Sequence, residues 1–167
     1  NAAIKLGVPA ENLVKGVDSV TFCLSKGLGA PVGSVLCGSY EFISKARRIR
    51  KQLGGGMRQA GVLAAAGIIA LETMIDRLEE DHQRALLLAD LLRSVPNVSI
   101  RKNSPQTNMV FFDLQYDYPK TNFQIIEELE KKNILIGSSK KYGFRLVTHY
   151  GITDEDITEV VAGLNSV

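Results

Sequence analysis

The stretch DSVTFCLSKGLGAPVGSVLCGS, residues 18–39, predicts two short strands joined by a glycine-rich turn. Residues 17–25 alternate and carry Val, Thr and Phe, which is typical of a strand. Residues 33–38 predict a second strand, and the segment KGLGAP between the two forms the turn. This stretch indicates a sheet in the first half of the chain.

Helical patterns follow. Residues 40–51 predict a short amphipathic helix, and the three glycines Gly54–Gly56 break the helical pattern after it. Residues 57–74 are dense in Ala, Leu and Ile, so we expect a buried helix there. A further helix is expected over 76–94, with Asp76 and Glu79 as its capping pair.

The last part of the chain predicts a β-β-α-β-β-α unit. Strands are expected at 98–102, 108–114, 134–138 and 143–149, and helices at 121–132 and from Thr153 to about Leu164. Thr153 and Asp156 form the capping pair of the final helix. We therefore predict an α/β chain in two parts, with the boundary in the helical stretch near residues 75–95.

Composition excludes several classes of protein. The chain has 167 residues, a net charge of +2, 45% hydrophobic and 23% charged residues, which is typical of a globular protein and atypical of a dedicated nucleic-acid binder. The apolar run from Ala60 to Leu71 is too short to span a bilayer. Cys23 and Cys37 are expected to be buried, reduced thiols of a cytoplasmic protein.

Lys26 ends an apolar strand directly before the glycine-rich turn. A lysine in a partly desolvated pocket can lose its proton and attack a carbonyl, and the following glycines let a flat ligand approach. The alternative is an ordinary lysine in a loop. The glycines Gly27, Gly29 and Gly33 resemble a dinucleotide fingerprint only superficially, because no helix opens within them.

The segment GGGMRQ, residues 54–59, leads into a helix whose first N–H groups suit an anion. Arg58 adds a charged fork that matches phosphate, although a flexible hinge with a solvated arginine is the equal alternative. The basic run on the preceding helix, which ends in Lys51, is interpreted as a solvated face from which one or two members could reach an anionic site.

Arg145 lies within the strand-like GFRLVTH, where alternation would place Arg145, Val147 and His149 on one face. A mid-strand arginine between apolar residues needs a carboxylate partner, from the protein or from a ligand. His82 and His149 have no ligand-like neighbours at metal-binding spacing, so no metal site is expected.

Three segments together resemble one family. DSVTFCLSKGLGAPVGSVLCGS (18–39), RKQLGGGMRQAGVLAAAGIIAL (50–71) and FRLVTHYGITDEDI (144–157) are similar to the low-specificity L-threonine aldolases, fold-type I enzymes that depend on pyridoxal 5′-phosphate (PLP). The resemblance covers essentially the whole chain and implies the C-terminal half of such an enzyme. Residues 1–75 would then belong to the PLP-binding large domain, and residues 76–167 would form the connecting helix and the small C-terminal domain.

The resemblance also implies roles for matched residues. Lys26 matches the lysine that binds the cofactor covalently, and Arg58 matches an arginine that reaches its phosphate, typically across a subunit interface. Arg145 matches the arginine that holds the substrate α-carboxylate, and Lys51 matches a basic residue near the active site. The implied activity is cleavage of L-threonine or L-allo-threonine to glycine and an aldehyde, with a homo-oligomer as the working form.

The family's aspartate at the pyridine nitrogen, its ring-stacking histidine and its main phosphate turn have no match in this chain. We therefore expect the missing N-terminal half of the same enzyme as a partner, and no cleavage by these residues alone. The alternatives are another fold-type I enzyme, such as an aminotransferase or β-eliminating lyase, and a non-catalytic fragment.

Overall fold

The computed structural model describes residues 1–115, 117–139 and 143–167. The chain forms two compact units. One consists of Ala2–Leu78, and the other of Glu79–Val167 together with Asn1. Each unit has its own sheet. Among the described residues, no helix combines the length and the apolar character that a membrane span requires.

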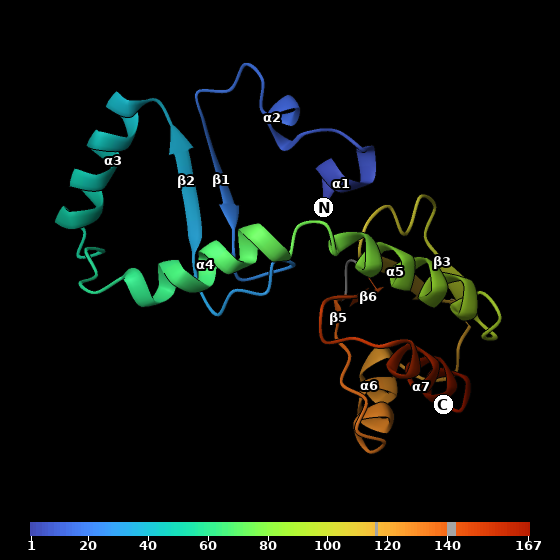
Figure 1. The fold of residues 1–167 in the computed structure, drawn as a ribbon. Helices are drawn as coiled ribbons and strands as arrows, with labels where there is room; N and C mark the ends of the chain where they lie inside the picture. Colours follow the sequence, from blue (N-terminus) through green and yellow to red (C-terminus); the bar gives the residue numbers. More distant parts are fainter. Residues whose placement is uncertain (116, 140–142) are drawn as a thin grey trace. The chain divides into compact units, whose positions relative to one another are not determined.

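The first unit is built around an antiparallel hairpin of β1 and β2 (Figure 1). Its elements are α1 (Ala2–Leu6), α2 (Ala10–Leu13), β1 (Ser19–Cys23), β2 (Ser34–Gly38), α3 (Tyr40–Gln52) and α4 (Gly61–Thr73). Ser39 caps α3 by accepting a hydrogen bond from the Phe42 N–H at 3.2 Å. The two predicted strands are confirmed, with boundaries one or two residues tighter, and the short helix after them is confirmed and extends one residue further, to Gln52.

The helix predicted over 57–74 is Gly61–Thr73, and the expectation that it is buried is wrong. Only Gly67 and Ala70 are buried on α4, whereas Val62, Ile68 and Ile69 are more than half exposed. Within this unit the core is small, with Leu24 and Ala30 joining Ala70. A two-stranded sheet offers too little surface to cover a 13-residue apolar helix on more than one side.

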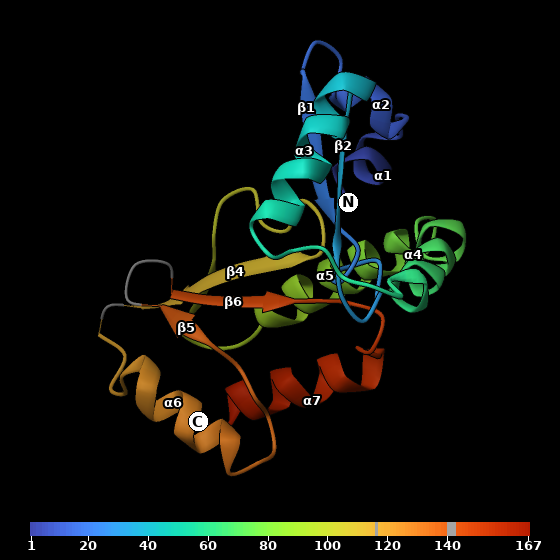
Figure 2. The ribbon, with the colours of Figure 1, turned by 90° about the vertical axis from the view of Figure 1, so that its left-hand side faces the viewer.

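The second unit contains one antiparallel sheet in the order β3-β4-β6-β5. Figure 2 shows β4, β6 and β5 side by side. Its elements are α5 (Leu78–Leu92), β3 (Val98–Ile100), β4 (Met109–Leu114), α6 (Asn122–Glu130), β5 (Ser138–Ser139), β6 (Gly143–Val147) and α7 (Asp154–Asn165). The predicted order of strands and helices is confirmed. The capping box of Thr153 and Asp156 is also present, and Thr121 with Gln124 forms a second one.

The core of this unit lies on one face of the sheet. Phe112 of β4 and Phe144 of β6 are fully buried and stack with ring centroids 4.9 Å apart. Residues of α5, α6 and α7 close over them in one apolar cluster. The opposite face carries Met109, Phe111 and Asp113 of β4 with Arg145 and Val147 of β6, and these side chains are half-buried or exposed. The sheet therefore has a covered face and an open face within its own unit.

Three local expectations are wrong. Residues 134–137 are not part of the sheet, because β5 pairs with β6 only at Ser138 and Ser139. Helix α5 begins at Leu78, so Asp76 lies too early to cap it. Cys23 and Cys37 are both exposed free thiols, because few residues of the first unit pack against the hairpin that carries them.

Candidate active site

Lys26 lies in a tight turn directly after β1. The turn is closed by hydrogen bonds from the Gly29 N–H to the Lys26 carbonyl at 2.9 Å and from the Ala30 N–H to the Leu24 carbonyl at 3.0 Å. Gly29 has φ +72°, a left-handed conformation that favours glycine. The glycines therefore fold the backbone into a compact loop with Lys26 at its tip.

The turn is anchored on α4 from both sides of Lys26. Leu24 and Ala30 are buried and pack with Ala70. A Cβ at Gly67 would lie 3.0 Å from Leu24 Cδ1, so the absence of a side chain there lets the turn approach the helix closely. Lys26 itself is exposed, and none of the residues described forms a hydrogen bond or ion pair with its ammonium. The desolvated pocket expected around this lysine is not formed by its own unit.

Arg58 lies two residues before Ala60, the N-cap of α4. Ala60 has no capping side chain, so the first N–H groups of this 13-residue helix are open to an acceptor. Gln59, with φ +51°, turns the chain sharply between Arg58 and the helix. Arg58 is exposed and has no partner within the described parts of the chain. Its guanidinium and the helix N terminus both favour an anion.

Lys51 of α3 lies against the glycine segment that precedes Arg58. A Cβ at Gly56 would approach Lys51 Cδ to 2.7 Å and Lys51 Nζ to 3.4 Å, so the lysine side chain lies closely against this glycine. The Gly55 N–H donates to the Arg50 carbonyl at 2.8 Å and folds the segment back onto the end of α3. Lys51 and the Gly56–Arg58 segment are thus brought together.

The Lys26 turn and Arg58 lie next to different parts of α4. The Lys26 turn packs against Gly67 and Ala70, whereas Arg58 precedes the N-cap at Ala60. Seven residues separate Ala60 from Gly67, which at 1.5 Å per residue is about 10 Å of helix. The Lys26 turn and the N terminus of α4 therefore do not contact the same part of this helix.

Arg145 belongs to the second unit and lies on the open face of its sheet. Its Cα partner on β4 is Phe111, and Val147 follows it on the same face. The Arg145 side chain is exposed, and no residue that the structure describes pairs with it. A guanidinium that lacks a carboxylate from its own chain is available to a ligand carboxylate.

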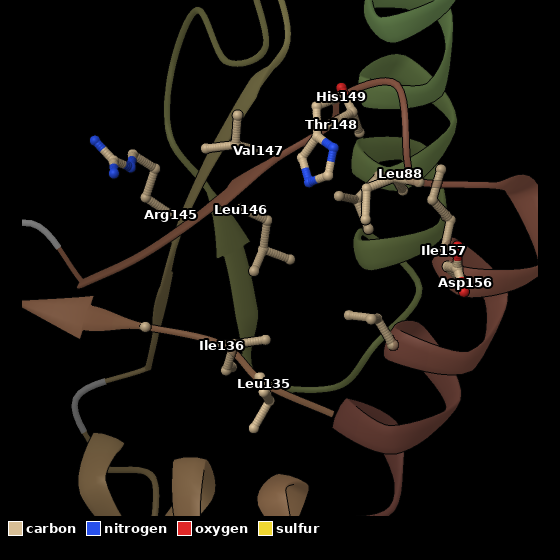
Figure 3. Close-up of a pocket in the computed structure, with 13 residues that line it drawn as sticks. Leu88, Leu135, Ile136, Arg145, Leu146, Val147, Thr148, His149, Asp156 and Ile157 are labelled. Carbon is tan, nitrogen blue, oxygen red and sulfur yellow. The ribbon is translucent and has the colours of Figure 1, made fainter. Parts of the chain in front are cut away.

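The covered face holds a cavity of about 240 Å³ (Figure 3). Leu146, Leu88, Ile136 and Ile157 line it, and the Arg145 guanidinium points away from it (Figure 3). His149 lies beyond the end of β6, and its ring borders the cavity, where its Nδ1 accepts a hydrogen bond from the Gly151 N–H at 3.2 Å. The expectation that His149 shares a face with Arg145 is therefore wrong, because strand alternation ends at Val147.

Arg101 and Asp113 were not predicted as part of any site. Asp113 accepts two hydrogen bonds from Arg101, at 2.6 Å from Nε and 2.7 Å from Nη2. Arg101 holds the pKa of Asp113 below its usual range, and Asp113 raises that of Arg101. The signal was available in VSIRK and NMVFFDL, each of which carries one charged residue in or beside an apolar strand.

The described residues thus offer a free amine, a free guanidinium beside a helix N terminus, and a second free guanidinium on a sheet. Such a set suits a carbonyl compound, a phosphate and a carboxylate. No group of three or more histidine, cysteine or acidic residues that could hold a metal occurs in the parts of the chain described.

Comparison with known proteins shows the family of the chain. The family model for beta-eliminating lyases matches residues 1–115. The chain belongs to the beta-eliminating lyase family. This family member is 46% identical over 157 residues to low-specificity L-threonine aldolase 1 of Arabidopsis thaliana, covering 94% of this chain and 44% of that protein. It is 41% identical over 162 residues to the low specificity L-threonine aldolase of Escherichia coli K12, covering 97% and 46%.

Solved structures give the same fold. A putative L-allo-threonine aldolase from Listeria monocytogenes superposes with a TM-score of 0.78 at 19% identity, covering 98% of this beta-eliminating lyase family member and 48% of that chain. The cystine C–S lyase C-DES, with glycine covalently linked to its PLP cofactor, gives 0.70 at 20% identity, covering 99% and 49%. The predicted fold-type I class is confirmed. The chain spans about half the length of the curated relatives it matches.

Proposed function

We propose that this chain is part of a PLP-dependent aldolase that cleaves L-threonine, L-allo-threonine and related β-hydroxy-α-amino acids to glycine and an aldehyde. The identity of 41–46% to low-specificity L-threonine aldolases supports this activity. The observation that carries the proposal is the placement of Lys26. Its primary amine is exposed and has no partner among the residues described. The glycine turn that holds it is anchored on both sides by buried residues.

The residues present fit pyridoxal phosphate, which carries an aldehyde and a phosphate. Lys26 would hold the aldehyde carbon covalently through Nζ. Arg58 and the open N terminus of α4 would hold the phosphate, with Lys51 adding positive charge beside Gly56. The distance of about 10 Å along α4 between Gly67 and the N-cap favours a phosphate contact to the cofactor of a second subunit.

Arg145 would bind the substrate α-carboxylate through two parallel N–H donors. A bidentate contact fixes the plane of the carboxylate and thereby the directions of the bonds at Cα. Pyridoxal phosphate, when bound, supplies a conjugated ring that accepts the electron pair released at Cα. The contribution of the chain itself is therefore attachment through Lys26, anion binding through Arg58 and Lys51, and orientation through Arg145.

We also propose that the working enzyme is a homo-oligomer, a dimer or tetramer, in the cytoplasm. The exposed apolar side chains of α4, among them Val62, Ile68 and Ile69, suit coverage by further residues of the same enzyme. The missing N-terminal half of the relatives' length would supply residues that complete the site. Two exposed free thiols, Cys23 and Cys37, suit a reducing compartment.

Product analysis tests the proposed reaction. The enzyme that carries this sequence at the full length of its relatives, supplied with PLP, should release acetaldehyde and glycine in equal amounts from L-allo-threonine. Lys26→Ala should abolish release, while Lys15→Ala, an exposed lysine in the same unit, should leave it unchanged. Formation of a keto acid without acetaldehyde would instead indicate an aminotransferase, and ammonia with a keto acid a β-eliminating lyase.

A further inference from the structure

Two arginines flank one aromatic residue on the open face of the second sheet. Phe111 of β4 has Arg145 of β6 as its Cα partner. On its other side, the Arg101 N–H donates to the Phe111 carbonyl at 3.0 Å, which continues the pairing of Ile100 with Phe112 by one residue. Arg101, directly after β3, therefore forms a row with Phe111 of β4 and Arg145 of β6, with both cations on the same face.

Asp113 follows Phe111 on this face, contacts Arg101 and is a diagonal neighbour of Arg145 in the register of β4 with β6. Its Cα partner on β3 is Ser99, and opposite it on β6 is Gly143. A Cβ at Gly143 would overlap Asp113 Oδ1, so the carboxylate lies directly over β6, two residues from Arg145. Diagonal neighbours in an antiparallel pair have Cα atoms about 7–8 Å apart, a distance that an arginine side chain spans. Asp113 is thus placed to pair with either arginine.

The structure shows Asp113 with Arg101 alone. Both carboxylate oxygens are engaged, by Nε at 2.6 Å and Nη2 at 2.7 Å, which is the bidentate geometry of a strong arginine–carboxylate pair. Arg145 has no carboxylate partner among the residues described and points away from the apolar cavity (Figure 3). One arginine is neutralised within the sheet, and the other is left free.

We propose that Arg101 is a positioning residue that occupies Asp113 and thereby keeps Arg145 available for the substrate carboxylate. Without Arg101, Asp113 would be an unpaired carboxylate, and among the residues described Arg145 is the diagonal cation that faces it across β4 and β6. It would then compete with the substrate for that guanidinium. This inference rests on the proposed role of Arg145 in substrate binding and extends it to the residues that control its charge environment.

Kinetics of the full-length holoenzyme test the inference. Arg101→Met should raise KM for L-allo-threonine about twofold to fivefold, the range of a partly exposed competing ion pair, with kcat nearly unchanged. Arg101→Met combined with Asp113→Asn should return KM to the wild-type value, because the competing carboxylate is gone. A merely structural role for Arg101 would not be rescued by removing its partner. Arg101→Lys, which keeps a cation beside Asp113, should remain near the wild type.

Two further measurements separate the possible failures. Binding of glycine to each holoenzyme variant, measured by calorimetry, should follow the same order as KM. Arg145→Met should raise KM by more than any Arg101 variant; a wild-type KM for it would overturn both the role of Arg145 and this inference. A raised KM in Arg145→Met with a wild-type KM in Arg101→Met would overturn the inference alone. So would a double variant that stays as impaired as Arg101→Met.

Discussion

Gly143→Ala should destabilise the second unit strongly. Gly143 opens β6 with φ +56°, and a side chain in this left-handed conformation costs about 1–2 kcal/mol. The new Cβ would also lie 2.7 Å from the Phe112 carbonyl and would overlap Asp113 Oδ1. Overpacking of this kind costs roughly 1–3 kcal/mol. The expected loss in the free energy of unfolding is therefore about 2–5 kcal/mol.

Tyrosine fluorescence during thermal unfolding measures this loss. The chain contains no tryptophan and five tyrosines, of which only Tyr40 lies outside residues 79–167, so the signal reports mainly on the second unit. For a chain of this length each kcal/mol lowers Tm by about 2–4 °C, which predicts a fall of roughly 4–20 °C. The displaced Asp113 would also release Arg101.

Gly137→Ala is the matched control. Gly137 lies in the same unit, and its Cβ would meet nothing within 4 Å. Its backbone carries no positive φ, so alanine should be neutral or slightly stabilising through the unfolded chain. If the Tm of Gly143→Ala lies within 1 or 2 °C of that of Gly137→Ala, roughly the shift for half a kcal/mol, then the described approach of Asp113 to β6 is incorrect.

Two other predictions concern charge. Arg58→Ala should weaken PLP binding by roughly tenfold to a hundredfold, because a charge-assisted hydrogen bond contributes about 1.5–3 kcal/mol. Equilibrium dialysis measures this affinity, with Arg48→Ala, which changes an exposed arginine of α3, as the control. Equal PLP affinities of the two variants would show that Arg58 is only a solvated hinge residue. Because Arg101 lowers the pKa of Asp113, this carboxylate stabilises the fold above about pH 4, and its contribution is lost as the pH falls through the lowered pKa of the folded state. Urea midpoints between pH 5 and pH 2 should accordingly fall less steeply for Asp113→Asn than for the wild type, and parallel curves would show that the pair adds no stability.

Local patterns predicted the features that depend on neighbouring residues. The glycines around Lys26 and the apolar residues before it specify a strand and a closed turn without help from distant segments. The Thr153–Asp156 capping box is equally local, and it occurs where its two residues predict it. The segment around 134–138 is a counterexample, since its apolar residues suit a strand but only Ser138 and Ser139 find a partner on β6.

Features that depend on which distant residues pack against a segment were not predictable from one sequence. The composition of α4 indicates a helix that favours burial, but it does not say which surface covers it, and most of that helix is exposed in its own unit. The Arg101–Asp113 pair depends on the register of β3 against β4, which the separate strand patterns leave open. For the same reason the sequence left open whether Arg145 meets a carboxylate of its own chain or one from a ligand.

The covalent attachment of the cofactor tests the central claim most directly. The full-length holoenzyme is reduced with borohydride, digested and mapped by mass spectrometry to find the lysine that carries the pyridoxyl group. The account predicts a single modified site at Lys26 Nζ, lost in Lys26→Ala and retained in Lys51→Ala. A pyridoxyl group on Lys51 or any other lysine, with Lys26 unmodified, would contradict it.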